Sequence, residues 1–587
     1  MISLDQLNAV SAAQFVAALE SVWERSPWVP ERTAASRPFR SGLELHAAMC
    51  AVVGSASVDD QLSLIRAHPE LAGRAAIRGE LTPDSTREQQ GAGLDACTPE
   101  EFARLQKLNT AYRERFGFPF VLAVKGHNRE SILRELERRV AHEMGEERAT
   151  ALREIGRIAA FRLEDLIEET AGGWIISRAE ALARISERED ALVCSYLRPA
   201  HLATAARLRD WMLACGLIVE IDAVGNVIGR WPAAPTGGAS GPAGAAATLL
   251  TGSHYDTVVD AGKFDGRLGI LLPLAVVLHL RREGIRLPYT LKIIAFAEEE
   301  GVRFKSTFLG SRAITGRFDS QLLDSVDSDG VSMGEALRSA GFDPDPTKIA
   351  AAALETSNLL GFVEVHIEQG PVLLKADLPL GVVTSIAGSI RSVVCVAGVA
   401  GHSGTVPMQL RHDAAAGAAE MVLAVERRCS GIAGLVGTVG QLSVPGGAIN
   451  VIPGRCELSI DIRADKDSVR DAAFADVRTE CERIATRRRL TLDWRKVLEA
   501  NCVPCAPVMQ QRWVDSIQRV TGVNAQLLPS GAGHDAMVMA EMTDVGMLFV
   551  RCGNGGISHH PLETLSEADA DIAARAFRDF LLNLIPI

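Results

Sequence analysis

The chain has 587 residues, of which 47% are hydrophobic and 23% charged, and this composition excludes an intrinsically disordered protein. Its 61 Lys and Arg residues against 73 Asp and Glu residues give a net charge of −12, which argues against a nucleic-acid partner. At roughly 100–200 residues per domain, the length predicts several domains rather than one.

Neither a membrane span nor secretion is expected from the sequence. The longest apolar run, residues 268–280, is shorter than the roughly 20 residues that cross a bilayer. The opening residues, MISLD, lack the basic and apolar stretches of a signal peptide, which favours a cytoplasmic location. Eleven scattered cysteines are typical of reduced thiols. We interpret the one close pair, Cys502 and Cys505, as loop cysteines, with a redox or zinc-ribbon role as the alternative.

The first part of the chain is predicted to be helical. Between residues 11 and 166, apolar side chains recur three and four positions apart, as in Phe15, Leu19 and Val22. Prolines preceded by Ser or Thr divide this stretch into helices of ordinary length, and strand patterns are nearly absent. We therefore predict an all-α domain over residues 1–170.

After about residue 171, runs rich in β-branched residues alternate with helical ones, which predicts an α/β architecture. A β-rich block over residues 386–499 interrupts this pattern, so we expect an inserted α+β domain there. The α/β domain would then comprise residues 175–385 and 500–587. Residues 233–247 are rich in Ala, Gly, Pro and Ser, and we predict a surface loop. The predicted fold class is therefore multidomain.

Four separate segments carry metal-binding side chains where a predicted strand ends. In an open α/β sheet, ligands bind outside the carboxyl ends of the strands, so these segments would converge there. Two divalent metal ions that share one bridging carboxylate need about two further protein ligands each. The side chains that supply this inventory are His254, Asp265, Glu300, His366 and His559. Taken singly, each of these residues would more readily have a structural role. Taken alone, the run Glu298-Glu299-Glu300 would more readily be a solvent-exposed stretch.

The same segments resemble the ureido branch of the two-metal amidohydrolases, a family related to aminoacylases and carboxypeptidases. The resemblance covers about residue 178 to the C-terminus and is carried by the motifs GSHYDTVVDAGKFDG, AEEEGVRF, HIEQGPVL, GAINVIPG and GISHHPLE. It implies two zinc or manganese ions. The implied ligands are His254, Asp265 and His366 for one ion and, for the other, Asp265 as a bridge, Glu300 and His559. The choice of His559 over its neighbour His560 rests on the spacing to the flanking residues.

The resemblance also implies catalytic and substrate-binding roles. Glu299 would be the general base, and Asp256 would orient the His254 imidazole. His402 would reach the active site from the lid domain, residues 386–499, of a neighbouring subunit and stabilise an oxyanion, which predicts a homodimer. The implied contacts to a small ureido substrate are Gln369, Asn450, Arg463 and His534. From the residues alone, Arg463 would more readily form a salt bridge on the face of its strand.

The N-terminal stretch resembles 2-oxo-4-hydroxy-4-carboxy-5-ureidoimidazoline (OHCU) decarboxylase, an all-helical enzyme of urate breakdown. The match covers about residues 4–166 and includes the motifs AHPELAGRAA, STREQQGAGL and RFGFPFVLAVKG. It implies His68 as the catalytic acid/base with Glu88 as its partner, and no cofactor, because the conjugated ring of the substrate accepts the electrons left by decarboxylation. The implied substrate contacts are Ser85, Gln89 and Arg162. Ser85 and Glu88 alone also fit a capping box.

Together the two resemblances predict a bifunctional enzyme of purine breakdown. The helical domain would form (S)-allantoin, and the metal domain would hydrolyse allantoate to ureidoglycine, ammonia and carbon dioxide. Neither part resembles an allantoinase, so direct transfer of product between the two sites is not expected. The alternatives for the metal domain are an N-carbamoyl-L-amino-acid hydrolase and a ureidoglycolate amidohydrolase. The alternative for the helical domain is a non-catalytic docking or oligomerisation module.

Overall fold

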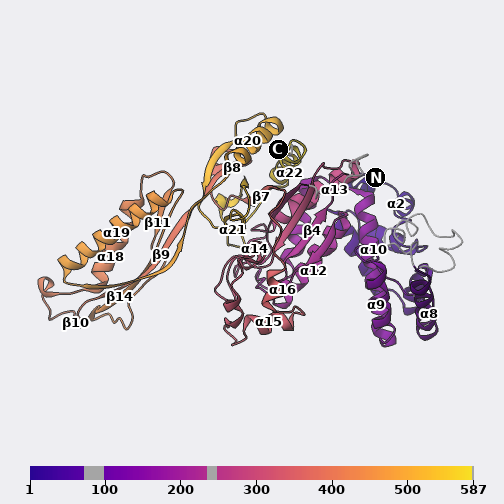
Figure 1. Cartoon of the computed structure of the whole chain (residues 1–587), viewed down its shortest axis with the longest axis horizontal. Coiled ribbons are helices and arrows are strands. Elements are labelled where there is room, and N and C mark those ends of the chain that lie inside the picture. Colours follow the sequence, from indigo (N-terminus) through magenta and orange to yellow (C-terminus); the bar gives the residue numbers. More distant parts are fainter. Residues whose placement is uncertain (72–97, 235–246, 585–587) are drawn as a thin grey trace. The chain divides into compact units, whose positions relative to one another are not determined.

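The computed structural model describes residues 1–71, 98–234 and 247–584 (Figure 1). The chain forms two compact units, one comprising Met1–Leu359 and Ile557–Ile587 and the other Leu360–Gly556. The loop predicted at residues 233–247 lies almost entirely outside the described residues. Within the described ranges, no helix is both long and apolar enough to cross a membrane.

The N-terminal part of the first unit is helical, as predicted (Figure 1). Its helices are α1 (Leu4–Ala9), α2 (Ala12–Ala18), α3 (Trp28–Thr33), α4 (Gly42–Ser55), α5 (Val58–Ala67), α8 (Pro99–Phe116), α9 (Arg129–Arg139) and α10 (Met144–Leu166). Ser41, Ser57 and Thr98 cap α4, α5 and α8, because their side chains accept a hydrogen bond from a backbone N–H of the first turn. The prediction of a purely helical domain was wrong in one detail. β1 (Ile2–Ser3) pairs in parallel with β2 (Ile167–Glu168), since the backbones of the two ends of the domain meet there.

One apolar core holds these helices together. Aromatic rings form its centre, and the ring centroids of Tyr112 and Phe120 lie 5.3 Å apart. The core extends to Leu213 and Ala214, which belong to α12 (Pro199–Ala214) beyond the helical domain. The helical domain is therefore packed against the rest of its unit through shared apolar side chains.

The rest of the first unit is α/β. Its strands follow the spatial order β5 (Thr248–His254), β6 (Thr290–Phe296), β4 (Val227–Trp231) and β3 (Ile218–Ile221). The almost wholly apolar helix α13 (Leu268–Arg282) packs against β5 and β6. Because β5 and β6 are parallel, His254 lies opposite Phe296, and the residues that follow the two strands leave the sheet at the same edge.

The second unit contributes strands to three sheets, the smallest of which is the antiparallel pair β10 (Gly401–His402) and β13 (Val451–Ile452). In the first sheet, β7 (Leu359–Ile367) and β18 (Val545–Val550) are parallel, and β8 (Leu380–Ile386) runs antiparallel to β18. β18 is buried along its whole length and β7 over its last seven residues, which explains their nearly continuous apolar sequences. The parallel pairing brings His366 opposite Phe549 at the carboxyl end of β7.

The second sheet of this unit is antiparallel (Figure 1). Four of its five strands follow the spatial order β11 (Leu435–Thr438), β14 (Arg455–Ala464), β9 (Gly388–Ala397) and β15 (Thr491–Ala500), and β12 (Leu442–Ser443) also pairs with β14. Two helices, α18 (Ala414–Cys429) and α19 (Asp467–Arg488), pack against it, and side chains along β14 alternate between buried and more accessible positions. These elements lie between β8 and β16 (Val503–Pro504) in the sequence, although β8 and β16 pair with each other in the first sheet.

Candidate metal centre and decarboxylase site

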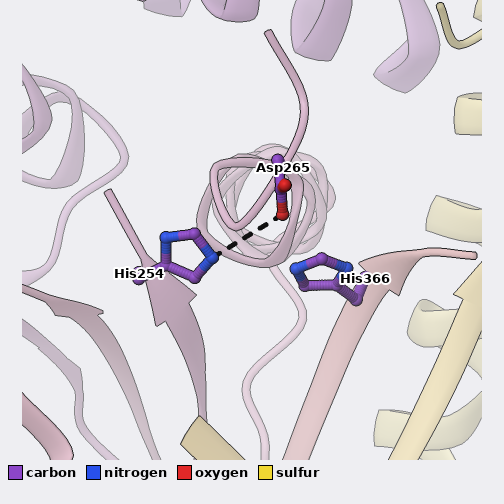
Figure 2. A group of neighbouring side chains, drawn as sticks. All are labelled: His254, Asp265 and His366. Atoms are coloured by element: carbon purple, nitrogen blue, oxygen red, sulfur yellow. Dashed lines mark ion pairs between the residues drawn. The ribbon is translucent and has the colours of Figure 1, made fainter. Parts of the chain in front are cut away.

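His254 stands at the carboxyl end of β5 between two carboxylates. Its Nδ1 lies 3.4 Å from Asp256 Oδ1, and its Nε2 lies 3.7 Å from Asp265 Oδ1, the pair joined by the dashed line in Figure 2. All three side chains are buried. Burial by itself lowers the pKa of His254, but its contacts with Asp256 and Asp265 outweigh burial and raise the pKa well above its ordinary value.

Asp256 also links the loops that follow β5 and β6. Its Oδ1 accepts a hydrogen bond from the backbone N–H of Glu299 at 3.1 Å, and its Oδ2 accepts one from Glu300 at 3.2 Å. The two loops can meet in this way because β5 and β6 end at the same edge of the sheet. One carboxylate thereby holds both glutamates in position relative to His254.

His559 completes a second group in the first unit. Its Nε2 lies 3.0 Å from Asp265 Oδ2 and 3.7 Å from Glu300 Oε1. The hydrogen bond with Asp265 raises the pKa of His559 to about 9, and burial raises the pKa of Glu300 to about 7. The neighbouring His560 instead accepts a hydrogen bond at Nδ1 from the backbone N–H of Leu562, at 3.1 Å.

Glu563 is a buried residue of this site to which sequence reasoning assigned no role, although it ends the motif GISHHPLE. Its Oε1 accepts hydrogen bonds from the backbone N–H groups of Phe264 and Asp265, at 2.8 and 3.2 Å. Its Oε2 accepts one from Ser558 Oγ at 2.8 Å, and this hydroxyl also lies 3.3 Å from Asp265 Oδ2. Glu563 thus fixes the loop that presents Asp265.

We expect Glu563→Ala to weaken metal binding by about 10–100-fold, because residues that position metal ligands typically contribute that much. The measurement is metal content after equilibration in chelator-buffered zinc. Glu563→Gln is the matched control, since its amide oxygen still accepts the backbone hydrogen bonds, and it should retain most of the affinity. Wild-type affinity in the alanine variant would contradict a positioning role.

In the second unit, His366 lies near the carboxyl end of β7 and is labelled in Figure 2. Its Nδ1 lies 2.9 Å from the carbonyl oxygen of Ile367, so Nδ1 carries the proton and Nε2 is left as the ligand atom. The ring of His534 packs against it with centroids 4.6 Å apart, and His534 Nε2 lies 2.7 Å from Ser530 Oγ. Gln369 follows β7 with a left-handed backbone, at φ 56°.

The side chains of the first unit fit a divalent metal ion. The ligand atoms of Asp265, Glu300 and His559 lie within 4.8 Å of one another, as do those of His254, Glu299 and Glu300. Imidazole nitrogens and carboxylate oxygens are donors that both zinc and manganese accept. Desolvation raises the pKa of the partly buried Glu300, and a cation bound beside it would stabilise its carboxylate form.

Three predicted substrate-binding or catalytic residues lie in the antiparallel part of the second unit. Arg463 forms the ion pair on its own strand, with Nη2 2.9 Å from Asp461 Oδ2, and it also donates to the carbonyl oxygen of Gly531 at 2.7 Å. His402 is exposed, and its Nδ1 accepts a hydrogen bond from the backbone N–H of Gly404. Asn450 is exposed close by, since its carbonyl oxygen accepts from the backbone N–H of Ser403 at 3.0 Å.

The helical domain brings His68 and Arg162 near each other. His68 is buried at the end of α5, and its Nδ1 lies 3.0 Å from the carbonyl oxygen of Leu64. Burial lowers the pKa of His68 to about 4, and the charges of Glu24 and Arg162 also act on it. Arg162 Nη1 pairs with Glu24 Oε2 at 3.1 Å. The buried residue Glu24 was missed, because no pattern in the sequence marks it. The predicted residues Ser85, Glu88 and Gln89 lie outside the described residues.

Comparison with known families finds two matches, which cover different parts of the chain. Residues 8–164 match the family described as OHCU decarboxylase. Residues 250–583 match the family described as Peptidase family M20/M25/M40. Both resemblances noted in the sequence are thereby confirmed.

Individual relatives resemble the second part. Allantoate deiminase of Arabidopsis thaliana is 38% identical over 434 residues, which cover 69% of this chain and 81% of the relative. N-carbamoyl-L-amino acid amidohydrolase of Geobacillus stearothermophilus is 36% identical and covers 70% of this chain and 94% of the relative. The crystal structure of an amidase of the hydantoinase/carbamoylase family from Burkholderia multivorans has a TM-score of 0.65 at 28% identity, over 71% of this chain and 99% of that one. The chain belongs to the M20/M25/M40 peptidase family and carries an N-terminal region of the OHCU decarboxylase family.

Proposed function

We propose that this chain catalyses two separate reactions of urate breakdown. The helical domain decarboxylates OHCU to (S)-allantoin, and the metal-binding part hydrolyses allantoate to ureidoglycine, ammonia and carbon dioxide. The observation that carries the proposal is the presence of the two family matches on one chain. The first family belongs to urate breakdown, so allantoate is the ureido substrate that places both parts in one pathway. A second support is that a relative of this chain is an allantoate deiminase.

The metal ligands in this proposal are divided between two ions. As the family resemblance implies, His254, Asp265 and His366 would hold one ion, and Asp265, Glu300 and His559, whose ligand atoms lie close together within the first unit, would hold the other. When bound, zinc or manganese would polarise the ureido carbonyl and lower the pKa of the attacking water molecule. Asp256 keeps three residues of this site in place, because its carboxylate lies 3.4 Å from the His254 imidazole and accepts hydrogen bonds from the backbone N–H groups of Glu299 and Glu300.

Glu299 carries the proton in this reaction. It is 9% exposed, and its backbone is held by Asp256. Its carboxylate takes a proton from the attacking water and delivers it to the nitrogen that leaves when the C–N bond of the ureido group breaks. The carbamate that remains loses carbon dioxide, so one water molecule is consumed for each ammonia and carbon dioxide released.

In the helical domain, His68 is the proton carrier. Its Nδ1 is held by the Leu64 carbonyl oxygen, which leaves Nε2 to exchange protons with the substrate. Carbon dioxide leaves with its bonding electrons retained by the conjugated ring. His68 takes up a proton from solvent at Nε2 and places it on one face of the resulting carbanion. Arg162, held by Glu24, supplies a positive charge for the substrate carboxylate.

The lid, residues 386–499, forms a homodimer in this proposal, so that His402 serves the active site of the partner. Large apolar side chains exposed on the lid support this, because such patches favour association. They include Met408, Leu410, Val436, Leu442 and Ile449, which are 71%, 62%, 56%, 55% and 105% exposed. Light scattering should find a dimer that the double variant Leu442→Asp, Ile449→Asp converts to a monomer. Val523→Asp, at an exposed valine outside the lid, should stay dimeric, and a monomeric wild type would refute the proposal.

A second candidate for the metal part is hydrolysis of N-carbamoyl-L-amino acids, which the Geobacillus relative favours. Both substrate classes release ammonia, so one assay separates them. We expect the purified protein, stripped of metal and then given manganese or zinc, to hydrolyse allantoate with a higher kcat/KM than N-carbamoyl-L-amino acids. The opposite preference would keep the metal chemistry and overturn the choice of allantoate.

A further inference from the structure

A cavity of about 650 Å³ lies in the first unit where the helical domain meets the helices that follow it. Its walls come from α4 and α10 of the helical domain and from α11 (Ala171–Ala183) and α12 on the other side. None of the site residues described above lines it. Among the described residues, the cavity therefore shares no lining side chain with either candidate active site.

The walls of the cavity are mainly apolar. Trp23, Val53 and Phe161 line it from the helical domain, and Trp211 and Ala214 line it from α12. Small-molecule sites typically occupy about 300–1,000 Å³ and are lined in this way, with few polar groups that fix orientation. The volume and lining suit an apolar group of one or two rings.

The charged groups on the lining are unbalanced. Three carboxylates lie there, and each already has a partner: Glu164 and Glu169 pair with Arg178, and Asp210 Oδ1 lies 2.8 Å from Arg157 Nη2. Three further arginines line the cavity, and within the described residues none of them forms an ion pair. They are Arg148, Arg153 and Arg207. The cavity thus offers guanidinium groups that no carboxylate of the described chain neutralises.

We propose that this cavity binds an organic anion with an apolar body, such as an aromatic carboxylate or sulfonate. The apolar walls take the body of the ligand. The three arginines without an ion pair take its charge, because the guanidinium group forms paired hydrogen bonds with planar anions. Arg148 and Arg153 belong to α10 and Arg207 belongs to α12. A ligand held by both helices would tie the helical domain to the rest of its unit.

The test uses two fluorescent probes on the full-length protein. 8-Anilinonaphthalene-1-sulfonate has an apolar body and an anionic group, and N-phenyl-1-naphthylamine is its neutral counterpart. We expect saturable binding of the sulfonate at one site per chain and weaker binding of the amine at this site. Equal affinity for the two probes would show an apolar cavity without anion recognition and would overturn the proposal.

Matched variants locate the bound probe. Arg207→Gln should raise the Kd for the sulfonate by about tenfold or more, as expected when a charged hydrogen bond is lost. Arg209→Gln removes the same charge from the same helix outside the lining and should leave the Kd unchanged.

A second pair of variants tests occupancy of the volume. Gly54 lines the cavity, and Gly145 does not. A Cβ atom added at either position would have no other heavy atom within 4 Å, apart from its own helix backbone and chain neighbours. Gly54→Leu should weaken binding of both probes, whereas Gly145→Leu should not. Binding that is insensitive to both Arg207→Gln and Gly54→Leu would place the probe elsewhere and refute the proposed site.

Discussion

Glu299→Ala is expected to lower kcat for ammonia release from allantoate by about 10²–10⁴-fold, the usual contribution of a general acid–base group. Metal content should stay at the wild-type level, because the proposed ligands and the hydrogen bond between Asp256 and the backbone N–H of residue 299 remain. Steady-state kinetics and metal analysis on the same preparation provide the measurement.

Two further variants make this result specific. Glu300→Ala should lose both metal and activity, because Glu300 is proposed as a ligand and lies 3.7 Å from His559. Glu355→Ala removes an exposed glutamate and should change neither property. Near-normal turnover in Glu299→Ala would exclude this carboxylate as the proton carrier, whereas parallel loss of metal and activity would assign it to the ligand set.

His68→Ala is expected to abolish the enzymatic formation of (S)-allantoin from freshly generated OHCU, a loss of about 10²–10⁴-fold in rate. The physical reason is stereochemical as well as kinetic, since protonation without His68 would occur on both faces of the carbanion. Circular dichroism of the allantoin formed over time measures both effects, because the racemic product gives no signal.

His127→Ala is the matched control, because it removes a partly buried histidine of the same domain that contacts Ser131. It should retain the (S) excess. Thermal unfolding of both variants checks that the domain remains folded. If the wild-type protein formed allantoin no faster than buffer, the helical domain would act as a docking or oligomerisation module.

The family, the multidomain organisation and the helical character of the N-terminal part were predictable from sequence because each rests on a local pattern. Helical periodicity is visible within one helix, and motifs such as HIEQGPVL are contiguous. The short pairing of β1 with β2 was not predictable, since strands of two residues carry no periodicity. Arg463 shows what can and cannot be predicted from a strand pattern. Its ion pair with Asp461 was predictable, because residues two apart on a strand share a face. A contact of Arg463 with substrate was not, because it depends on where the substrate binds relative to that strand.

The sequence by itself determined the two enzyme families, the residue types able to bind metal and their position at the ends of strands. Only the tertiary structure decided which distant groups hold those residues in place. Glu563 fixes the backbone of Asp265 from 298 positions away, and Glu24 holds Arg162 across the helical domain. The charged cavity between α10 and α12 likewise exists only once both helices are packed. Such hydrogen bonds and ion pairs join segments that are far apart along the chain, so no local spacing of residues encodes them.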